Sequence, residues 1–214
     1  MLRIAIDGPG GAGKSTIAKM LAAKLDLDYI DTGAMYRAAA LKMTRLGIPA
    51  EDPEAVEKAL ETTLIDFDKG SIYLDGEEVN EAIRTPEMGG LASAYSALGC
   101  VRRKLVERQK EMGRTKDCIM DGRDIGTNVL PDAEFKFFLT ATPEERAMRR
   151  YKELVEKGQD VSYEKILADI NERDYNDMHR ELDPLRKAED AIEVDTTKMT
   201  IEEVIAHLTA LIGR

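Results

Sequence analysis

The chain has 214 residues, of which 43% are hydrophobic and 34% charged, and this suits a single domain with a hydrophobic core. Its formal net charge of -10 argues against extended binding to nucleic acids or anionic membranes, because those partners attract a basic face. Two cysteines without C-x-x-C spacing, a core strand at the N-terminus and no apolar run of membrane-spanning length lead us to expect a cytoplasmic protein.

The first predicted strand, Leu2 to Ile6, leads into a glycine-rich loop that fits the P-loop pattern G-x-x-x-x-G-K-[ST]. The loop consists of Gly8, Pro9, Gly10, Gly11, Ala12, Gly13, Lys14, Ser15 and Thr16. Its N–H groups are expected to surround phosphate oxygens, while Lys14 reaches the terminal phosphates and Ser15 holds Mg²⁺. The pattern G-x-G-x-x-G of dinucleotide sites also fits, but such a site has no need of Lys14 and Ser15. We therefore predict a site for a nucleoside triphosphate.

A second strand is predicted at Asp28 to Ile30. It is followed by a helix that opens with Asp31-Thr32-Gly33-Ala34-Met35-Tyr36-Arg37. A helix N-terminus with an arginine in its first turns can bind a second anion. Alternatively, Thr32 only caps the helix and Arg37 is a solvated charge, and the local sequence leaves both interpretations open.

Residues 63–79 interrupt the alternation of strands and helices. Three short strands are predicted there, at Leu64 to Phe67, Ile72 to Leu74 and Glu77 to Val79. The loops between them, Asp68-Lys69-Gly70 and Asp75-Gly76, are short enough that they can only reverse the chain. These strands are therefore expected to be antiparallel and to form an insertion on a parallel core.

A buried strand is predicted at Cys118 to Met120, and Asp121-Gly122-Arg123-Asp124 follows it. Ligand sites of α/β sheets gather at the carboxyl ends of strands. Asp121 is therefore a candidate to help hold Mg²⁺ through water, and Arg123 to face a phosphate. The alternative is an Asp-Gly turn with incidental charges, and it is stronger for Asp124 than for Arg123.

Strands at Phe135 to Leu139 and Ala191 to Val194 lead into helices that start at predicted capping boxes, Thr142 to Glu145 and Thr200 to Glu203. The first of these helices runs from Pro143 to Lys157. It carries three cations on one face, Arg146, Arg149 and Arg150. They form either a mobile lid over the triphosphate or a solvated face paired with nearby glutamates.

The next helix begins near Ser162 and carries an apolar stripe of Tyr163, Ile166 and Ile170. At the same spacing the stripe continues into polar residues, which are Arg173, Asp177 and Arg180. Either the helix leaves the core there, or these side chains face a polar cleft. Asp174 is also four residues after Ile170, so the pattern does not decide whether Arg173 or Asp174 continues the stripe.

Together these motifs resemble those of the bacterial cytidylate kinases, in the nucleoside-monophosphate kinase group. The most distinctive segments are Ile6-Asp7-Gly8-Pro9, Asp31 to Arg37, Ile83-Arg84-Thr85, Asp121 to Thr127, Glu172-Arg173-Asp174 and the three-stranded insertion. The resemblance runs from the P-loop to the C-terminal helix. It implies an α/β fold with a P-loop NTPase core, in which helices flank a parallel β-sheet, and also a small antiparallel NMP-binding insertion and a helical lid.

The resemblance implies transfer of the ATP γ-phosphoryl group to CMP or dCMP, with Mg²⁺ as cofactor. The implied ATP-binding residues are those of the P-loop together with Arg146 and Arg150. The implied CMP-binding residues are Thr32, Tyr36, Arg37, Ser93, Arg102, Arg123, Asp124, Arg173, Asp177 and Arg180, and among them Ser93, Arg102 and Asp124 would read cytosine. The implied catalytic residues are Lys14, Arg37, Arg123 and Arg149, and the metal would be held by Ser15 and Asp121. Cys100 departs from the family, because relatives often carry a basic residue near it.

The family pattern implies one domain over residues 1–214. Its core comprises residues 1–61, 91–149 and 181–214, with the NMP-binding insertion at about 62–90 and the lid with its following helix at about 150–180. A monomer without nucleic-acid or membrane partners is expected. The rival functions are another small-molecule P-loop kinase, acting on UMP, AMP or shikimate, and a nucleotide-dependent switch. Guanine switches carry [NT]-K-x-D, whereas Arg114-Thr115-Lys116-Asp117 lacks the required spacer.

Overall fold

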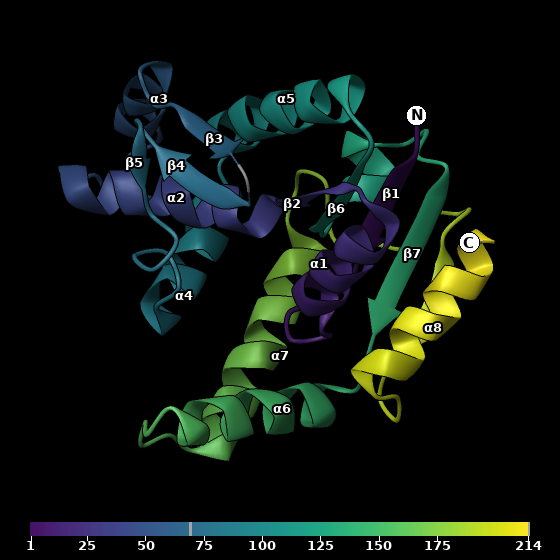
Figure 1. Ribbon diagram of the computed structural model, residues 1–214. Helices are drawn as coiled ribbons and strands as arrows, with labels where there is room; N and C mark the ends of the chain where they lie inside the picture. Colours follow the sequence, from purple (N-terminus) through teal and green to yellow (C-terminus); the bar gives the residue numbers. More distant parts are fainter. Residues whose placement is uncertain (69, 214) are drawn as a thin grey trace.

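The computed structural model describes residues 1–68 and 70–213. Its centre is a sheet in the strand order β2-β6-β1-β7-β8 (Figure 1). The strands are β1 (Arg3–Asp7), β2 (Asp28–Asp31), β6 (Cys118–Gly122), β7 (Phe135–Thr140) and β8 (Ile192–Asp195). All four pairings are parallel, so the predicted parallel core is confirmed.

Helices cover both faces of this sheet, and the side chains of β1 alternate between the two faces. Ile4 and Ile6 belong to one buried cluster, whereas Ala5 belongs to the other. The helices are α1 (Lys14–Leu25) and α8 (Ile201–Ile212) on the first face, and α2 (Thr32–Leu46) and α5 (Gly99–Thr115) on the second. Because β1 is buried on both faces, it gives the P-loop that follows it a rigid base.

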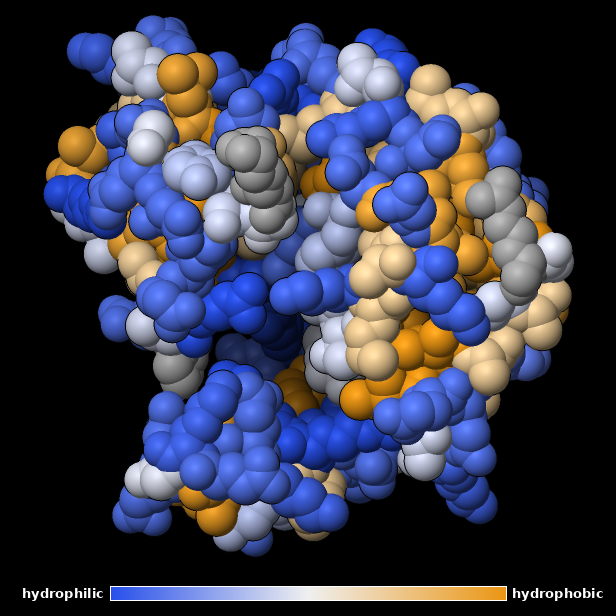
Figure 2. Space-filling view, in the orientation of Figure 1, coloured by the Kyte–Doolittle hydropathy of each residue, from blue (hydrophilic) through white to orange (hydrophobic). Residues whose placement is uncertain are grey.

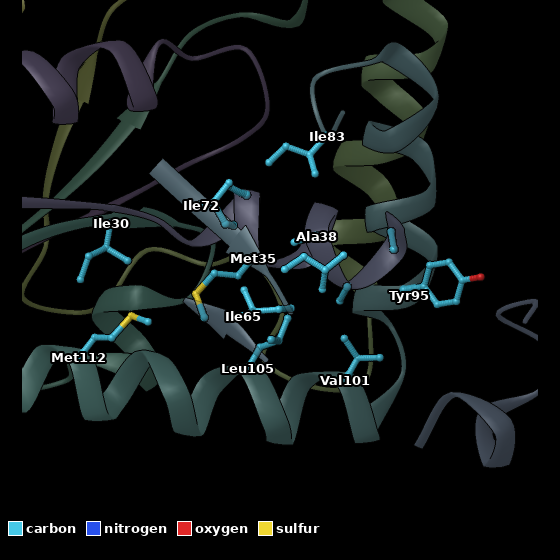
Figure 3. Close-up of a cluster of buried hydrophobic side chains, with 14 of the residues drawn as sticks. Ile30, Met35, Ala38, Ile65, Ile72, Ile83, Tyr95, Val101, Leu105 and Met112 are labelled. Atoms are coloured by element: carbon cyan, nitrogen blue, oxygen red, sulfur yellow. The ribbon is translucent and has the colours of Figure 1, made fainter. Parts of the chain in front are cut away.

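A separate antiparallel sheet in the order β3-β4-β5 confirms the predicted insertion. Its strands are β3 (Ile65–Asp68), β4 (Ser71–Leu74) and β5 (Glu77–Glu78), and α3 (Pro53–Glu61) and α4 (Pro86–Ser96) flank them along the chain. Lys69, in the predicted turn, lies outside the described residues. Figure 3 shows Ile65 and Ile72 of this sheet beside Met35 of α2 and Leu105 of α5. The insertion therefore shares its core with α2 and α5.

Two ion pairs fasten the insertion to α2. Lys42 Nζ lies 2.7 Å from an oxygen of Asp75, and Arg45 donates two hydrogen bonds to the carboxylate of Glu77. Both acidic residues lie at the β4–β5 hairpin, and both basic residues lie in the second half of α2. The hairpin and α2 are thus joined both by apolar packing and by ion pairs.

Helices α6 (Pro143–Glu156) and α7 (Tyr163–His179) pack on each other below the sheet in Figure 1. Their contact is a small apolar cluster in which Ile166 is buried, with Tyr163 and Ile170 against it. The predicted stripe of α7 is confirmed. Among the described residues, no helix is both long and apolar enough to cross a bilayer.

The two predicted capping boxes have different outcomes. Thr200 and Glu203 form the complete reciprocal box at the start of α8. Thr142 caps α6, but the Glu145 carboxylate accepts a hydrogen bond from Arg149 at 3.1 Å instead of returning to the Thr142 N–H. That N–H donates to Thr197 at 3.2 Å, so the prediction of a full box at Thr142 is wrong because tertiary partners take both groups.

The π-helical turn η1 (Ile125–Val129) is among the elements that the sequence analysis does not predict. Its i→i+5 bonds run from Val129 N–H to Asp124 at 3.2 Å and from Leu130 N–H to Ile125 at 2.7 Å. Such single wide turns are frequent at functional sites, and this one begins directly after Arg123 and Asp124. It therefore follows directly on the polar motif that ends β6.

Candidate active site

A hydrophilic hollow opens between the insertion side, the sheet and the α6–α7 pair (Figure 2). The carboxyl ends of β1, β2 and β6 lead into this hollow, because these three strands are parallel neighbours. Each strand is followed by one of the polar motifs that the sequence singled out. The topology thus brings together three segments that are far apart in the chain.

The P-loop closes the end of β1. Gly8 has a φ of 143°, and a Cβ there would lie 1.9 Å from the carbonyl oxygen of Leu139, so only glycine fits. Lys14 is buried, and its ammonium donates to the carbonyl of Pro9 at 2.8 Å. Burial and the positive charges of Arg123 and Arg173 lower the pKa of Lys14. A polyphosphate beside this ammonium would offset both effects.

Oxygen ligands gather where the P-loop helix meets β6. The Ser15 hydroxyl donates to Asp121 at 2.8 Å, and the Tyr29 hydroxyl donates to the other oxygen of the same carboxylate at 3.0 Å. The Thr32 hydroxyl donates to the Asp121 backbone carbonyl at 2.6 Å. Burial, with the negative charge of Asp31, raises the pKa of Asp121. The described residues contain no cluster of three or more His, Cys, Asp or Glu side chains that could hold a metal ion.

Three arginines from three elements form the next wall of the hollow. Arg37 pairs with Asp31 at 3.0 Å, and Arg123 donates to Asp177 at 2.8 Å. Arg173 has a buried Nε with no hydrogen-bond partner among the described residues. Burial and the charges of Arg123 and Arg37 lower the pKa of Arg173 to about 10. Arg37 and Arg123 thus each have a carboxylate partner, whereas the buried Nε of Arg173 is a donor that a further anion could use.

A second buried charge network lies on the α5 side. Arg102 is 2% exposed, and it donates to Asp124 and, at 2.9 Å, to Asp183. Arg180 approaches the other oxygen of Asp124 at 3.3 Å. The guanidinium of Arg102 also stacks over the ring of Tyr36, 5.7 Å from its centre. The structure therefore joins four of the predicted acceptor residues: Tyr36, Arg102, Asp124 and Arg180.

Some residues of this network were not predicted. The Asp183 carboxylate accepts a hydrogen bond from Arg102, and Gln109 is 1% exposed on α5 with a buried Nε2 that has no partner among the described residues. Tyr29, which donates to Asp121 beside the P-loop, was not predicted either. Gln109 follows Arg102 by seven residues, so a polar residue two turns along the buried face was the available signal. Ser93, which was predicted to read cytosine, lies half-buried on α4, where its backbone carbonyl accepts a hydrogen bond from the Ser96 hydroxyl at 2.8 Å.

The side chains of Arg146, Arg149 and Arg150 on α6 have three different sets of partners. Arg146 is buried, and it donates to the carbonyls of Ala141 and Gly10 and to the carboxylate of Asp174. Arg149 donates to the Thr196 carbonyl at 2.7 Å, and Arg150 pairs with Glu153 at 2.9 Å. Arg149 and Arg150 thus pair with the nearby Glu145 and Glu153, as the second alternative expects, whereas Arg146 turns inward to the P-loop.

The structure also decides which polar residues of α7 face the hollow. Asp177 faces Arg123 in the hollow, whereas Asp174 pairs with Arg146 on the lid side. The helix therefore presents a polar side chain to each neighbour, and Arg180 follows at its C-cap.

Comparisons with known proteins give a consistent result. A family model described as cytidylate kinase matches residues 4–214. A cytidylate kinase of Caldicellulosiruptor saccharolyticus is 54% identical over 214 residues, which cover 98% of this chain and 95% of that relative. One of Clostridioides difficile is 51% identical over 212 residues, covering 99% of this chain and 98% of the relative.

Two solved structures with a similar fold have much lower sequence identity. A shikimate kinase from Bacteroides thetaiotaomicron has a TM-score of 0.52 at 14% identity and covers 100% of this chain and 99% of its own. A gluconokinase from Sinorhizobium meliloti has the same TM-score and identity, with coverage of 100% and 92%. These similarities support the architecture of small-molecule P-loop kinases.

Proposed function

The chain belongs to the cytidylate kinase family, and from this premise we propose that it transfers the γ-phosphoryl group of ATP to CMP or dCMP. The products are ADP and the corresponding diphosphate. The observation that carries the proposal is the pair of adjoining cationic sites, with Lys14 in the P-loop and Arg37, Arg123 and Arg173 across the hollow. Two anions that meet there would be a polyphosphate donor and a monophosphate acceptor.

The chemistry of phosphoryl transfer explains why these residues suffice. The transition state is loose and spreads negative charge over the moving group, so orientation and fixed cations matter more than a strong base. Lys14 and the P-loop N–H groups would orient the donor phosphates. Arg37 and Arg123, held by Asp31 and Asp177, would orient the acceptor phosphate in line with the donor.

The donor and base contacts follow from the same geometry. Arg146 supports the P-loop through the Gly10 carbonyl, and we propose Arg149 and Arg150 as the lid residues that reach ATP when the lid closes. Arg102 and Asp124 would read the cytosine edge. Ser93 on α4 is proposed as a further contact to the base.

Mg²⁺ fits the oxygen pair at the P-loop. The Ser15 hydroxyl and the Asp121 carboxylate are hard oxygen ligands 2.8 Å apart, and this suits an ion that keeps its phosphate and water ligands. When bound, Mg²⁺ would neutralise charge on the donor phosphates. Asp121→Asn is expected to raise the Mg²⁺ concentration needed for half-maximal activity.

The direct test is a coupled ADP-release assay with CMP, dCMP, UMP, AMP and shikimate as acceptors. We expect CMP or dCMP to give the largest kcat/KM. A preference for UMP, AMP or shikimate would favour another P-loop kinase, and ADP formation independent of every acceptor would favour a switch. The high identity to cytidylate kinases argues against both alternatives.

We further propose that the protein acts as a monomer in the cytoplasm, in pyrimidine nucleotide metabolism. Residues at about 62–90 and 150–180 would close over the two nucleotides and exclude water, because exposed ATP would otherwise be hydrolysed. Small-angle scattering with and without both nucleotides tests closure, and light scattering tests the monomer.

A further inference from the structure

Asp7 is a buried acidic residue that the proposed mechanism does not use. It ends β1, directly before the first glycine of the P-loop, and it is 4% exposed. No lysine or arginine lies within ion-pair distance of it among residues 1–68 and 70–213. A buried carboxylate without a paired cation is costly, so its remaining contacts must compensate for lost hydration.

Those contacts are two backbone N–H groups of one turn. Ile125 N–H donates to one oxygen of Asp7 at 2.8 Å, and Gly126 N–H donates to the other at 2.7 Å. Burial, opposed by these two hydrogen bonds, raises the pKa of Asp7 to about 6, so the carboxylate is largely ionised at neutral pH. A carboxylate that uses both oxygens in this way fixes the turn in position and in rotation.

The position of this turn matters because of what precedes it. Asp124, the residue immediately before Ile125, receives hydrogen bonds from Arg102 and Arg180. Gly122, two residues earlier, is paired in register with Asp7 itself. The segment that carries Arg123 and Asp124 is therefore fixed to the end of β1 at both of its ends.

We propose that Asp7 is a positioning residue that holds the acceptor-recognition segment, residues 122–126, in a fixed place relative to the P-loop. Gly8 is bonded to Asp7 directly, so the donor loop and the Ile125–Gly126 turn share one anchor. The inference rests on the proposed function, because it assigns to Asp124 the reading of the acceptor base. It adds that the accuracy of this reading depends on a carboxylate that contacts neither nucleotide.

Asp7→Asn is the main test, because it keeps the size of the side chain but replaces one acceptor oxygen with a donor that opposes an N–H group. Loss of a charge-assisted hydrogen bond should raise KM for CMP by about tenfold or more and lower the CMP-to-UMP ratio of kcat/KM by a similar factor. The dissociation constant for ATP should stay equal or fall, since a negative charge near Lys14 is removed.

Two further variants make the result specific. Gly126→Ala disturbs the same hydrogen bond from the turn, because its Cβ would lie 3.3 Å from Asp7 Oδ2. It should change KM for CMP and the CMP-to-UMP ratio of kcat/KM in the same direction as Asp7→Asn. Ile4→Val removes one buried methyl group from the same strand and controls for reduced stability. It should leave KM and the acceptor ratio unchanged.

Amide hydrogen exchange gives a readout independent of turnover. We expect the Ile125 and Gly126 amides to exchange faster in Asp7→Asn, with protection elsewhere in the sheet retained. Unchanged KM and acceptor ratio, with only a smaller active fraction, would overturn the proposal, as would an equal loss of ATP and CMP affinity. If the wild-type chain ignores CMP, the proposed function fails and the positioning role falls with it, even where the exchange result shows that the anchor exists.

Discussion

Arg102→Ala gives the sharpest combined test of stability and selectivity. The change removes a guanidinium that is 2% exposed and leaves Asp124 buried with one partner fewer. Breaking a buried ion pair costs about 3–5 kcal/mol. We expect the lower end, about 3 kcal/mol, because Arg180 and Asn128 still donate to Asp124. For a chain of this size that corresponds to a fall in Tm of about 6–12 °C.

The functional effect of Arg102→Ala is separate from the loss of stability. A hydrogen bond to a charged group contributes about 1.5–3 kcal/mol, so discrimination between CMP and UMP should fall by roughly 10- to 150-fold. The assay is kcat/KM for each acceptor at a temperature well below the Tm of the variant. Arg103→Ala is the matched control, because Arg103 is the next residue on α5 but its side chain is 70% exposed. Unchanged discrimination in Arg102→Ala would refute the assigned role.

Three further predictions concern the P-loop and the buried carboxylates. Lys14→Met should reduce transfer by about a thousandfold or more without lowering Tm, since a buried ammonium is replaced by an apolar chain, and near-normal turnover would contradict the role of Lys14. Gly8→Ala should lower the free energy of unfolding by more than about 3 kcal/mol, because its Cβ would meet the Leu139 carbonyl, and urea unfolding at wild-type stability would disprove this. The pKa of Asp7 is raised from 3.8 to about 6, so the folded state takes up this proton at a higher pH than the unfolded state does. The protein should therefore become more stable as pH falls from 7.5 to 5, by about 1.4 kcal/mol from this group. Asp121 acts in the same direction, and urea titrations in which stability falls steadily over that range would contradict the sign.

Much of the fold could be predicted because its signals are local. The strand of the P-loop, the antiparallel insertion and the stripe of α7 all depend on apolar periodicity and turn chemistry within a few residues of one another. Helix α3 had a local signal as well, since Asp52 caps it and Pro53 opens it, but it was not predicted.

The partners of charged side chains could not be predicted in the same way. The spacing of Arg146, Arg149 and Arg150 defines a helical face, but only tertiary structure decides that Arg146 reaches the Gly10 carbonyl while Arg150 finds Glu153. Asp7 belongs to the family segment Ile6-Asp7-Gly8-Pro9, but its hydrogen-bond partners are the N–H groups of Ile125 and Gly126, more than a hundred positions away. The site residues named from the sequence remain predictions until substitutions test them.

The attachment of the three-stranded sheet to α2 has a consequence for how such enzymes can change. Lys42, Arg45 and the shared apolar core bind the hairpin to the helix that starts with Thr32 and carries Arg37. A change in the hairpin therefore reaches the helix that carries Thr32 and Arg37, whereas Arg102 and Asp124, which we propose to read the base, lie on other elements. A hybrid that receives the hairpin without α2 should lose the two ion pairs that join them, and one that receives both should still select cytosine as long as Arg102 and Asp124 are kept.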